Sequence, residues 1–307
     1  MSLPVAAIDL GTNTVLMLIA RLDDEGRFSV IEDRCEDPRL GAGLARTGRL
    51  DEAAAQRTLR VLEQFARELG ERGIERCRVV GTAVLRRAAD AEEFVARVQA
   101  ACGLRVEVIP EQEEARLGYQ AVVAEGGRAE TLIVDVGGGS TEIVGRGGEV
   151  RMSAPVGAVV LTETYLGLAG SEPTRSGGFP ALLVEAKSAV SCFPAGLAEE
   201  GLEVVCLGGS ASNLACLGQD LLRYESERAE GYILPVDIIP GWVRRLHALP
   251  LEERLKLPIE ASRAEILPAG LACMEAALSR IGARTIRVSG KGIRYGVARE
   301  LLVESAP

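Results

Sequence analysis

One pattern of acidic, glycine and hydroxyl residues occurs twice in this chain. Residues 9–14 read Asp-Leu-Gly-Thr-Asn-Thr, and residues 135–141 read Asp-Val-Gly-Gly-Gly-Ser-Thr. Glycines let a turn approach an anion closely and direct its N–H groups at it, and hydroxyls add further donors. An aspartate at the end of a strand can hold a metal ion or a water molecule. Ordinary hairpin turns need neither feature at matched offsets, so the repeat predicts two phosphate-binding turns.

Each copy lies between two apolar runs, a pattern that predicts strand, tight turn and strand. Residues 5–8 and 15–19 flank the first copy, and residues 132–134 and 143–144 flank the second. Their apolar and β-branched side chains favour strands. Two such hairpins that face each other would hold a phosphate chain from both sides.

The single histidine, His247, restricts the chemistry available to this chain. A Ser-His-Asp or Cys-His site would have to use it, and a zinc site would need mostly cysteine ligands. The residues around it follow the pattern of an amphipathic helix, which favours a surface or helix-end histidine. Hydrolytic chemistry would therefore rest on carboxylates and a hard cation such as Mg²⁺, which prefers oxygen ligands.

Composition narrows the class of protein further. A length of 307 residues suggests two domains, and 47% apolar with 26% charged residues indicates a soluble globular chain. The net charge of −9 argues against nucleic acid or anionic lipid as a partner. No apolar stretch reaches transmembrane length and the first residues lack a basic region, so we expect a cytoplasmic protein. Seven cysteines without a Cys-x-x-Cys pair favour buried free thiols.

The order of predicted elements indicates two similar α/β halves. In the first half, residues 1–124, we expect strands near 4–9, 14–21, 27–32, 77–82 and 105–109, and helices near 51–70, 90–102 and 111–124, with Asp51 as an N-cap. In the second half, residues 125–307, we expect three strands across 131–155, strands near 203–207 and 285–289, and helices near 157–167, 180–196, 210–217, 235–248, 263–281 and 292–303. Whether the last helix stays with the second half or packs on the first is open. A cleft is expected between the halves.

Five motifs, taken together, resemble the exopolyphosphatase and guanosine pentaphosphate phosphohydrolase (Ppx/GppA) family. The resemblance covers nearly the whole chain and is closest to the short, two-domain members. It implies two ribonuclease H-like domains of the actin-like superfamily. Two of the motifs are the glycine turns, at residues 9–14 and at residues 135–142, the second of which now includes Glu142. The other three are Gly-Thr-Ala-Val-Leu-Arg at 81–86, Glu-Glu-Ala-Arg at 113–116 and Gly-Gly-Ser-Ala-Ser at 208–212.

The resemblance also implies roles for individual residues. Glu114 would orient and deprotonate a water, and Arg86 would clamp the phosphoryl group. Asp135 would bind Mg²⁺, with Asp9 and Glu142 as supporting carboxylates; whether Mn²⁺ serves instead is open. The donors to phosphate oxygens would be Thr12, Asn13, Thr14, Gly137, Gly138, Gly139, Ser140 and Thr141. A distal phosphate or a ribose would lie at Gly208, Gly209, Ser210 and Ala211.

Several departures from the family pattern leave the substrate open. Residues 110–111 are Pro-Glu where relatives have Ser-Gly, residues 294–296 are Arg-Tyr-Gly instead of Arg-Glu-Gly, and residues 32–37 are acidic where relatives carry basic residues. We expect a hydrolase acting on short polyphosphate or guanosine pentaphosphate. The alternatives are a catalytically weak binding protein that senses guanosine tetra- or pentaphosphate or a nucleotide, and an ATP-dependent kinase of the same superfamily. Dimerisation is common in the resembled family, so a homodimer is a further open question.

Overall fold

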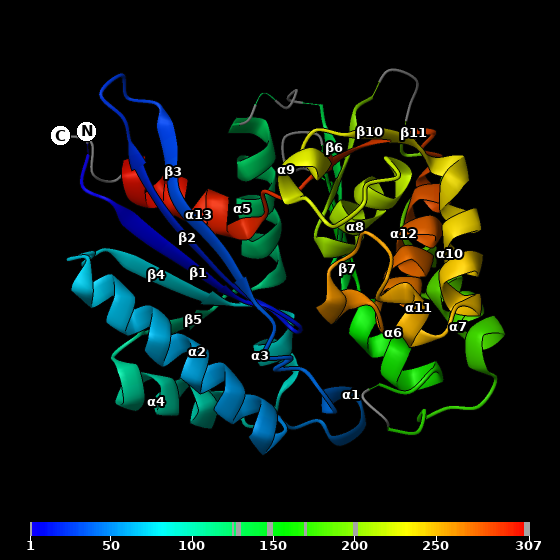
Figure 1. Cartoon of the computed structure of the whole chain (residues 1–307), viewed down its shortest axis with the longest axis horizontal. Coiled ribbons are helices and arrows are strands. Elements are labelled where there is room, and N and C mark those ends of the chain that lie inside the picture. Colours follow the sequence, from blue (N-terminus) through cyan, green and yellow to red (C-terminus); the bar gives the residue numbers. More distant parts are fainter. Residues whose placement is uncertain are drawn as a thin grey trace. The chain divides into compact units, whose positions relative to one another are not determined.

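The computed structural model describes residues 2–124, 126, 130–145, 150–168, 171–198 and 202–303. Two compact units divide the chain (Figure 1). The first unit contains the chain up to Ala121 together with the segment from Ile293 onward, and the second is Val122–Gly292. The last helix, whose position the sequence left open, therefore lies with the first unit.

The first unit is built on a five-stranded sheet with the order β3-β2-β1-β4-β5. Strands β1, β2 and β3 form an antiparallel meander, whereas β4 and β5 run parallel to β1. This arrangement requires helical crossovers after β3 and between β4 and β5. The strands are β1 (Val5–Leu10), β2 (Val15–Leu22), β3 (Phe28–Glu36), β4 (Cys77–Gly81) and β5 (Val106–Val108).

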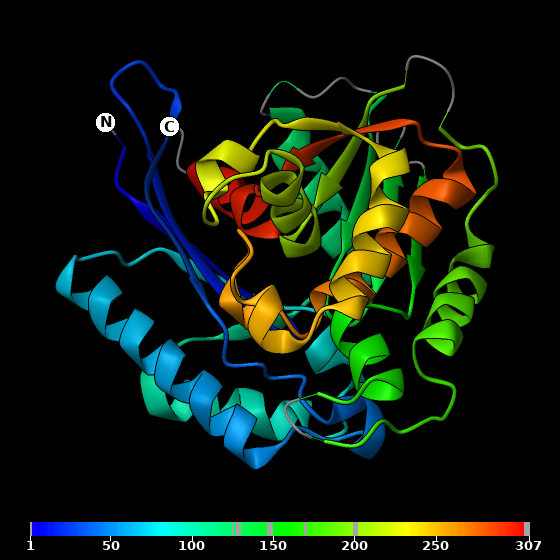
Figure 2. The ribbon, with the colours of Figure 1, turned by 45° about the vertical axis from the view of Figure 1, so that its right-hand side comes forward.

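Alternating side chains of β1 pack against helices on both faces of this sheet. Ala6, Ile8 and Leu10 join the core under α2 and α4, while Val5 and Ala7 join the core under α5 and α13. Figures 1 and 2 show α2 and α4 on one side of the sheet and α13 on the other. The helices are α1 (Leu44–Thr47), α2 (Glu52–Glu71), α3 (Ala83–Arg87), α4 (Ala91–Cys102), α5 (Glu111–Ala124) and α13 (Ile293–Val303).

The second unit repeats this strand order and adds one strand. Its sheet runs β8-β7-β6-β9-β11-β10, with β8, β7 and β6 antiparallel and β9 and β11 parallel to β6. The first five strands therefore match the order of the first sheet, which confirms the duplicated, ribonuclease H-like α/β fold. The strands are β6 (Leu132–Val136), β7 (Thr141–Gly145), β8 (Val150–Ala154), β9 (Val204–Leu207), β10 (Ile233–Pro235) and β11 (Thr285–Ser289).

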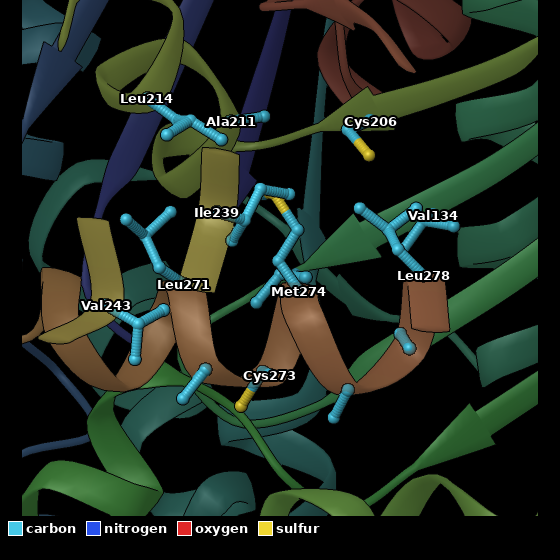
Figure 3. Packing of buried hydrophobic residues seen from close by; sticks show 14 of the residues in the cluster. Val134, Cys206, Ala211, Leu214, Ile239, Val243, Leu271, Cys273, Met274 and Leu278 are labelled. Atoms are coloured by element: carbon cyan, nitrogen blue, oxygen red, sulfur yellow. The ribbon is translucent and has the colours of Figure 1, made fainter. Parts of the chain in front are cut away.

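One helix, α12 (Leu267–Ile281), runs through the core of the second unit. Figure 3 shows Leu271, Met274 and Leu278 on one side of it and Cys273 on the opposite side, and all four are fully buried. The buried positions of this helix are apolar, whereas Glu275 is only partly buried and Ser279 and Arg280 near its end are exposed. The other helices of the unit are α6 (Ala158–Tyr165), α7 (Gly178–Ala189), α8 (Gly209–Gly218), α9 (Ser226–Ala229), α10 (Ile239–Ala248) and α11 (Leu251–Arg254).

Three helix boundaries differ from the sequence prediction by four or more residues, and each of these lies near a proline. The predicted helix at 235–248 begins only at Ile239, because Pro235 ends strand β10 and Pro240 occupies the first turn of α10. The helix predicted from 263 begins at Leu267, with Pro268 in its first turn. The helix predicted to 196 ends at Ala189, five residues before Pro194. Strand β3 also differs, because it continues to Glu36 instead of ending near residue 32.

Two smaller expectations have mixed outcomes. Asp51 caps α2 as predicted, since its side chain accepts a hydrogen bond from Ala54 N at 2.9 Å. All seven cysteines are free, as expected. Cys206, Cys216 and Cys273 are buried, whereas Cys77 and Cys102 are half-buried and Cys35 and Cys192 are exposed, so the expectation of buried thiols holds for three of the seven. Within the part of the chain that the structure describes, none of the helices has the length and apolarity needed to cross a membrane.

We expect Gly296→Ala to destabilise the first unit. A Cβ at this position would lie 2.2 Å from Leu117 O, so α13 could not approach α5 as closely as it does. The cost should be about 1–3 kcal/mol, the usual range for overpacking. Urea unfolding followed by circular dichroism measures it.

The matched control is Gly70→Ala in α2 of the same unit, where a Cβ meets no atom within 4 Å. That variant should be stabilised, or unchanged within about 1 kcal/mol, because alanine favours helix over glycine. Equal stabilities of the two variants would contradict the close approach of α5 and α13.

Candidate functional site

The first glycine turn joins β1 to β2 and is held by its own backbone and by a neighbouring loop. Gly11 N donates to Thr14 O at 2.9 Å, and the carbonyls of Thr12 and Asn13 accept from residues 41 and 39 at 2.8 and 3.0 Å. Residue 41 is a glycine because a Cβ there would lie 2.3 Å from Thr12 Cγ2. The three polar side chains at 12–14 are each at most 9% exposed, so the turn is fixed before any ligand arrives.

The side-chain amide of Asn13 is hydrogen-bonded through its nitrogen but, among the described residues, not through its oxygen. Its Nδ2 donates to Asp37 Oδ1 at 3.0 Å, whereas its Oδ1 is buried and accepts no hydrogen bond from the residues that the structure describes. A buried amide oxygen without a donor is costly unless a ligand or water satisfies it. This buried acceptor keeps Asn13 a predicted ligand-binding side chain of the first turn.

The second turn, between β6 and β7, has the same internal hydrogen bond. Gly137 N donates to Ser140 O at 3.0 Å, the counterpart of the bond from Gly11 to Thr14. Its outer support differs, because Gly138 O accepts from Val159 N and residue 160 N at the start of α6. Gly157 must lack a side chain, since a Cβ would lie 2.6 Å from Gly138 C. The two turns share their geometry but not their supports.

The side-chain hydroxyl of Thr141 is not available for the donor role that the sequence suggested. Its side chain is fully buried, and its Oγ1 donates to Val156 O at 2.7 Å. The single hydroxyl proton is used inside the second unit, so Thr141 stabilises the turn and cannot donate it to a phosphate. Ser140, one residue earlier, is 7% exposed and stays a predicted donor.

Two of the three predicted metal-binding carboxylates lie side by side. Asp135 on β6 pairs directly with Glu142 on β7, and residues directly opposite in an antiparallel pair project to the same face. Ser153 Oγ donates to Glu142 Oε1 at 3.1 Å and orients it. Across residues 2–124, 126, 130–145, 150–168, 171–198 and 202–303, no group of three or more His, Cys, Asp or Glu side chains could hold a metal ion.

Asp9, the third carboxylate, lies on β1 in the first unit and is 9% exposed. It shares a sheet face with Val5 and Ala7, which is the face that α5 and α13 cover. Burial lowers the pKa of Arg294 on α13, but hydrogen bonds to Asp33 and the charges of Tyr295 and Asp9 raise it above its usual value. Asp9 therefore lies in the field of a permanent cation.

Glu114 and Arg86 form a largely buried ion pair. Arg86 Nη1 lies 2.6 Å from Glu114 Oε2 and also donates to Ile109 O at 3.0 Å. Arg86 Nη2 is buried and makes no hydrogen bond within the described ranges; it lies 3.9 Å from Glu111 Oε1. The side chains of Glu114 and Arg86 are 13% and 18% exposed, so neither is an ordinary surface residue.

Burial raises the pKa of Glu114 above its usual value. The charge of Arg86 and its hydrogen bond act in the opposite direction, and the nearby Glu111 adds to the increase. A carboxylate whose proton affinity is raised in this way is a better base for water than an exposed glutamate.

Arg86 reaches this place by a helix that the sequence did not predict. The sequence predicts a strand over residues 77–82, but β4 ends at Gly81 and α3 begins at Ala83. Thr82 N and Oγ1 both bond to Leu10 O at 3.2 Å, which ties the start of α3 to the end of β1. Arg86 and the first glycine turn thus lie at the carboxyl ends of adjacent parallel strands, where α/β sheets bind ligands.

The equivalent place in the second unit is the segment 208–212, which follows β9. Gly208 has φ +88°, and a Cβ there would lie 3.1 Å from Asp135 Oδ1, so its backbone passes directly beside that carboxylate. A Cβ on Gly209 would meet the Arg263 guanidinium at 1.9 Å. Gly208 and Gly209 thus bring the start of α8 close to a carboxylate and a cation, and N–H groups in a first helical turn suit an anion.

Ser210 and Ala211 contribute less than the sequence suggested. Ala211 is fully buried in the core of the second unit, and Ser210 is 2% exposed, with its Oγ packed against Gly270. Their side chains are packing groups, which leaves only their backbone N–H groups for a ligand. His247, on α10, stacks on Phe179 with ring centroids 3.7 Å apart and also has a packing role.

The acidic stretch 32–37 turns out to be paired internally. Asp33 accepts two hydrogen bonds from Arg294, at 2.7 and 2.8 Å, and one from Tyr295 Oη at 2.8 Å. Glu32 pairs with Arg72 at 2.6 Å, and Asp37 holds Asn13. These partners were not predicted. The bonds from Arg294 and Tyr295 to Asp33 join residues 261 and 262 positions apart, which local sequence patterns do not reveal.

Two α/β units with glycine- and hydroxyl-rich turns at their strand ends form the architecture of phosphate-binding proteins. A model of the Ppx/GppA phosphatase family matches residues 18–304, and the chain belongs to this family. That assignment confirms the resemblance found from the motifs.

Individual relatives agree with the family assignment. The chain is 31% identical over 304 residues to the guanosine-5'-triphosphate,3'-diphosphate pyrophosphatase of Photobacterium profundum, covering 97% of this chain and 59% of that protein. It therefore spans about three fifths of the length of this curated relative. The crystal structure of the Aquifex aeolicus family member is 32% identical, with a TM-score of 0.78 and 99% of both chains covered. An exopolyphosphatase from Cytophaga hutchinsonii, 22% identical with a TM-score of 0.79 and 99% of both chains covered, shares the fold.

We expect Arg86→Gln to raise the pKa of Glu114 further. Burial already favours the protonated carboxyl, and the substitution removes the cation that favours the ionised form. Titration of ¹³C-labelled glutamate carboxyls by NMR measures the change. In Arg87→Gln, which alters the exposed neighbour on α3, Glu114 should titrate as in the wild type. An unchanged or lower pKa in Arg86→Gln would contradict the pairing.

Proposed function

We propose that this protein hydrolyses terminal phosphoanhydride bonds of guanosine pentaphosphate or of short inorganic polyphosphate. The observation that carries the proposal is the buried carboxylate of Glu114, 2.6 Å from Arg86, with its pKa raised by burial. Family membership and the printed names of the relatives support the reaction class. The net charge of −9 favours short substrates, because long polyphosphate needs an extended basic surface.

In this reaction a water attacks the terminal phosphorus, the bond to the bridging oxygen breaks, and inorganic phosphate leaves. Glu114 accepts the proton of the attacking water, and its raised proton affinity suits that task. Arg86 keeps its Nη1 on Glu114, and its Nη2, which makes no hydrogen bond within the described residues, donates its two N–H groups to phosphoryl oxygens. The backbone N–H groups of the two glycine turns and the side chains at 12–14 and 140 bind the remaining oxygens.

The chemistry also calls for a divalent cation, Mg²⁺ or Mn²⁺, and the donor set suits one. Asp135 and Glu142 present two oxygen ligands on one sheet face, and Asp9 is a supporting carboxylate in the first unit. The buried acceptor Asn13 Oδ1 suits a water of the hydration shell. Mg²⁺ uses one or two protein carboxylates and substrate oxygens. When bound, the cation would neutralise charge on the phosphoryl oxygens.

A second candidate function is a sensor that binds guanosine tetra- or pentaphosphate with little turnover. The observation in its favour is Glu111, whose carboxylate lies 3.9 Å from Arg86 Nη2 and competes with an anion for that cation. Binding without phosphate release would support the sensor. The kinase alternative would require phosphate transfer to an acceptor, so release of free phosphate to water speaks against it.

The direct test is phosphate release, with Mg²⁺, from tripolyphosphate, long polyphosphate and guanosine pentaphosphate. Glu114→Gln should lower kcat by about 10²–10⁴-fold, because it removes the base and keeps the side-chain shape. The control Glu71→Gln, an exposed position at the end of α2, should retain full activity. Turnover that survives in Glu114→Gln would refute the assigned base, and no turnover by the wild type would favour the sensor.

Asp135→Asn should weaken the binding of Mg²⁺. The half-saturating Mg²⁺ concentration should rise by about 10- to 100-fold, because an amide oxygen replaces a carboxylate beside Glu142. Thermal stabilisation of the protein by added Mg²⁺ provides a readout independent of activity. Asp220→Asn, an exposed position in the same unit, is the control and should respond to Mg²⁺ like the wild type.

A further inference from the structure

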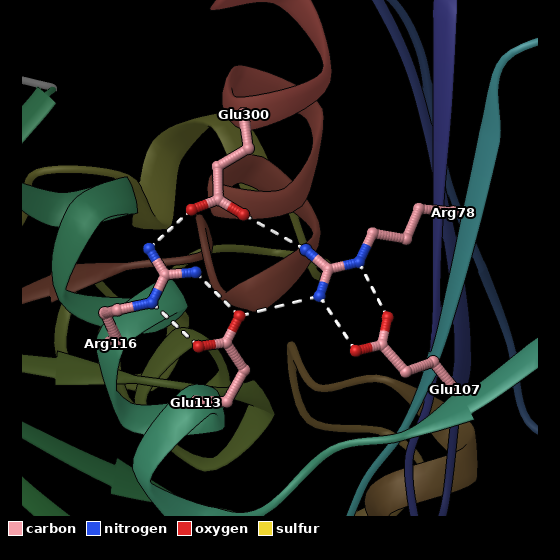
Figure 4. Close-up of polar contacts among 5 residues, drawn as sticks. All are labelled: Arg78, Glu107, Glu113, Arg116 and Glu300. Atoms are coloured by element: carbon pink, nitrogen blue, oxygen red, sulfur yellow. Dashed lines mark hydrogen bonds and ion pairs between the residues drawn. The ribbon is translucent and has the colours of Figure 1, made fainter. Parts of the chain in front are cut away.

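Two arginines and three glutamates of the first unit form one charge network (Figure 4). Arg78 comes from β4, Glu107 from β5, Glu113 and Arg116 from α5, and Glu300 from α13. No member belongs to the site described above. Glu113, however, directly precedes Glu114, so the network ends one residue from the proposed base.

Glu300 on α13 contacts both arginines of the network. Its Oε2 accepts from Arg78 Nη1 at 3.0 Å, and its Oε1 accepts from Arg116 Nη1. Arg116 in turn holds Glu113 through two bonds, Nε to Oε2 at 2.7 Å and Nη2 to Oε1 at 2.6 Å. Figure 4 shows Arg116 between Glu113 and Glu300, with Glu107 at the far end beyond Arg78.

The inner four members are shielded enough for these charges to count. The side chains of Arg78, Glu113, Arg116 and Glu300 are between 23% and 32% exposed, whereas Glu107 is 52% exposed. Hydrogen bonding to Arg116 lowers the pKa of Glu113, so this carboxylate stays ionised at neutral pH. Charge-assisted, two-bond contacts of this kind restrict side-chain direction more than single neutral bonds do.

Fixing Glu113 fixes the direction of Glu114. Consecutive side chains of an α-helix project about 100° apart, so a rotation of the first turn of α5 would move both together. Glu113 points to Arg116 and Arg78 on one side, and Glu114 points to Arg86 on the other. The backbones of α5 and α13 also touch, since Gly296 has no room for a Cβ beside Leu117 O. Glu300 thus ties the turn that carries Glu114 to a helix that returns from the far end of the chain.

We propose that Glu300 is a positioning residue for Glu114, acting through Arg116 and Glu113; the inference rests on the proposed function. Without the Glu300 carboxylate, Arg116 still holds Glu113, but both belong to α5 itself. Among the side-chain ion pairs of the described residues, the first turn is then tied to other elements by the 3.5 Å contact between Arg78 and Glu113 and by the contacts of Arg86 with Glu114 and Glu111. Small displacements of a catalytic group lower the rate steeply, so the effect should appear in kcat.

The test compares Glu300→Gln with Glu107→Gln, the same substitution at the two ends of the network. Glu107 contacts Arg78 at 2.9 Å and no residue of α5 in the network. At a temperature where all proteins are folded, Glu300→Gln should lower kcat about tenfold with KM changed less than about threefold, and Glu107→Gln should keep both within about twofold. Glu300→Asp, which keeps the charge on a shorter side chain, should recover part of the lost kcat.

Amide hydrogen exchange of residues 111–117 supplies a readout that does not depend on turnover. Exchange there should quicken in Glu300→Gln and not in Glu107→Gln. If the wild type releases no phosphate, the proposed function fails, and exchange still decides whether Glu300 orders this turn. Equal kcat in Glu300→Gln and Glu107→Gln, or equal exchange, would overturn the proposal.

Discussion

The first unit is organised around one buried contact, the carboxylate of Glu114 against the guanidinium of Arg86 at 2.6 Å. A buried charge is tolerated only with a partner, so α3 and α5 must both be placed within tight limits. Gly81 permits α3 to turn back at once, because a Cβ there would lie 2.5 Å from Leu85 Cδ1. Burial keeps the pKa of Glu114 above its usual value, although the charge of Arg86 and its hydrogen bond act to lower it.

Duplication has kept the geometry of the turns and changed their surroundings. The same hydrogen bond closes both turns, but a loop around Gly41 supports the first and the start of α6 supports the second. The segments that follow β4 and β9, the fourth strand in each sheet order, differ more. In the first unit this segment is α3, which carries Arg86, and in the second it is a glycine pair beside Asp135. The first unit thus carries the Glu114–Arg86 ion pair, and the second carries the Asp135–Glu142 pair and a helix start, so the two halves present different chemical groups.

Local patterns predicted most of the strands and turns, since periodicity and capping act over a few residues. Asp51 capped its helix as expected, and the glycine turns lie where the motifs placed them. The failures involve partners distant in sequence or elements too short to have a period. Helix α3 has five residues, Thr141 is committed to a carbonyl 15 residues away, and Arg116 meets Glu300 across 184 residues. That the two turns face each other across a cleft stays a prediction.

The net negative charge of the chain acts at long range, whereas the carboxylates near the first turn are paired at short range. Around the first turn, the carboxylates that looked repulsive to an anion are engaged with Arg294, Tyr295, Arg72 and Asn13. Internal pairing of this kind cancels charge at short range, while the net charge of −9 still acts at long range. A polyanion would therefore be repelled until it is close and then held by N–H groups, hydroxyls and one guanidinium. The proposed site would favour a compact terminal phosphate that fits the turns over a long chain that extends beyond them.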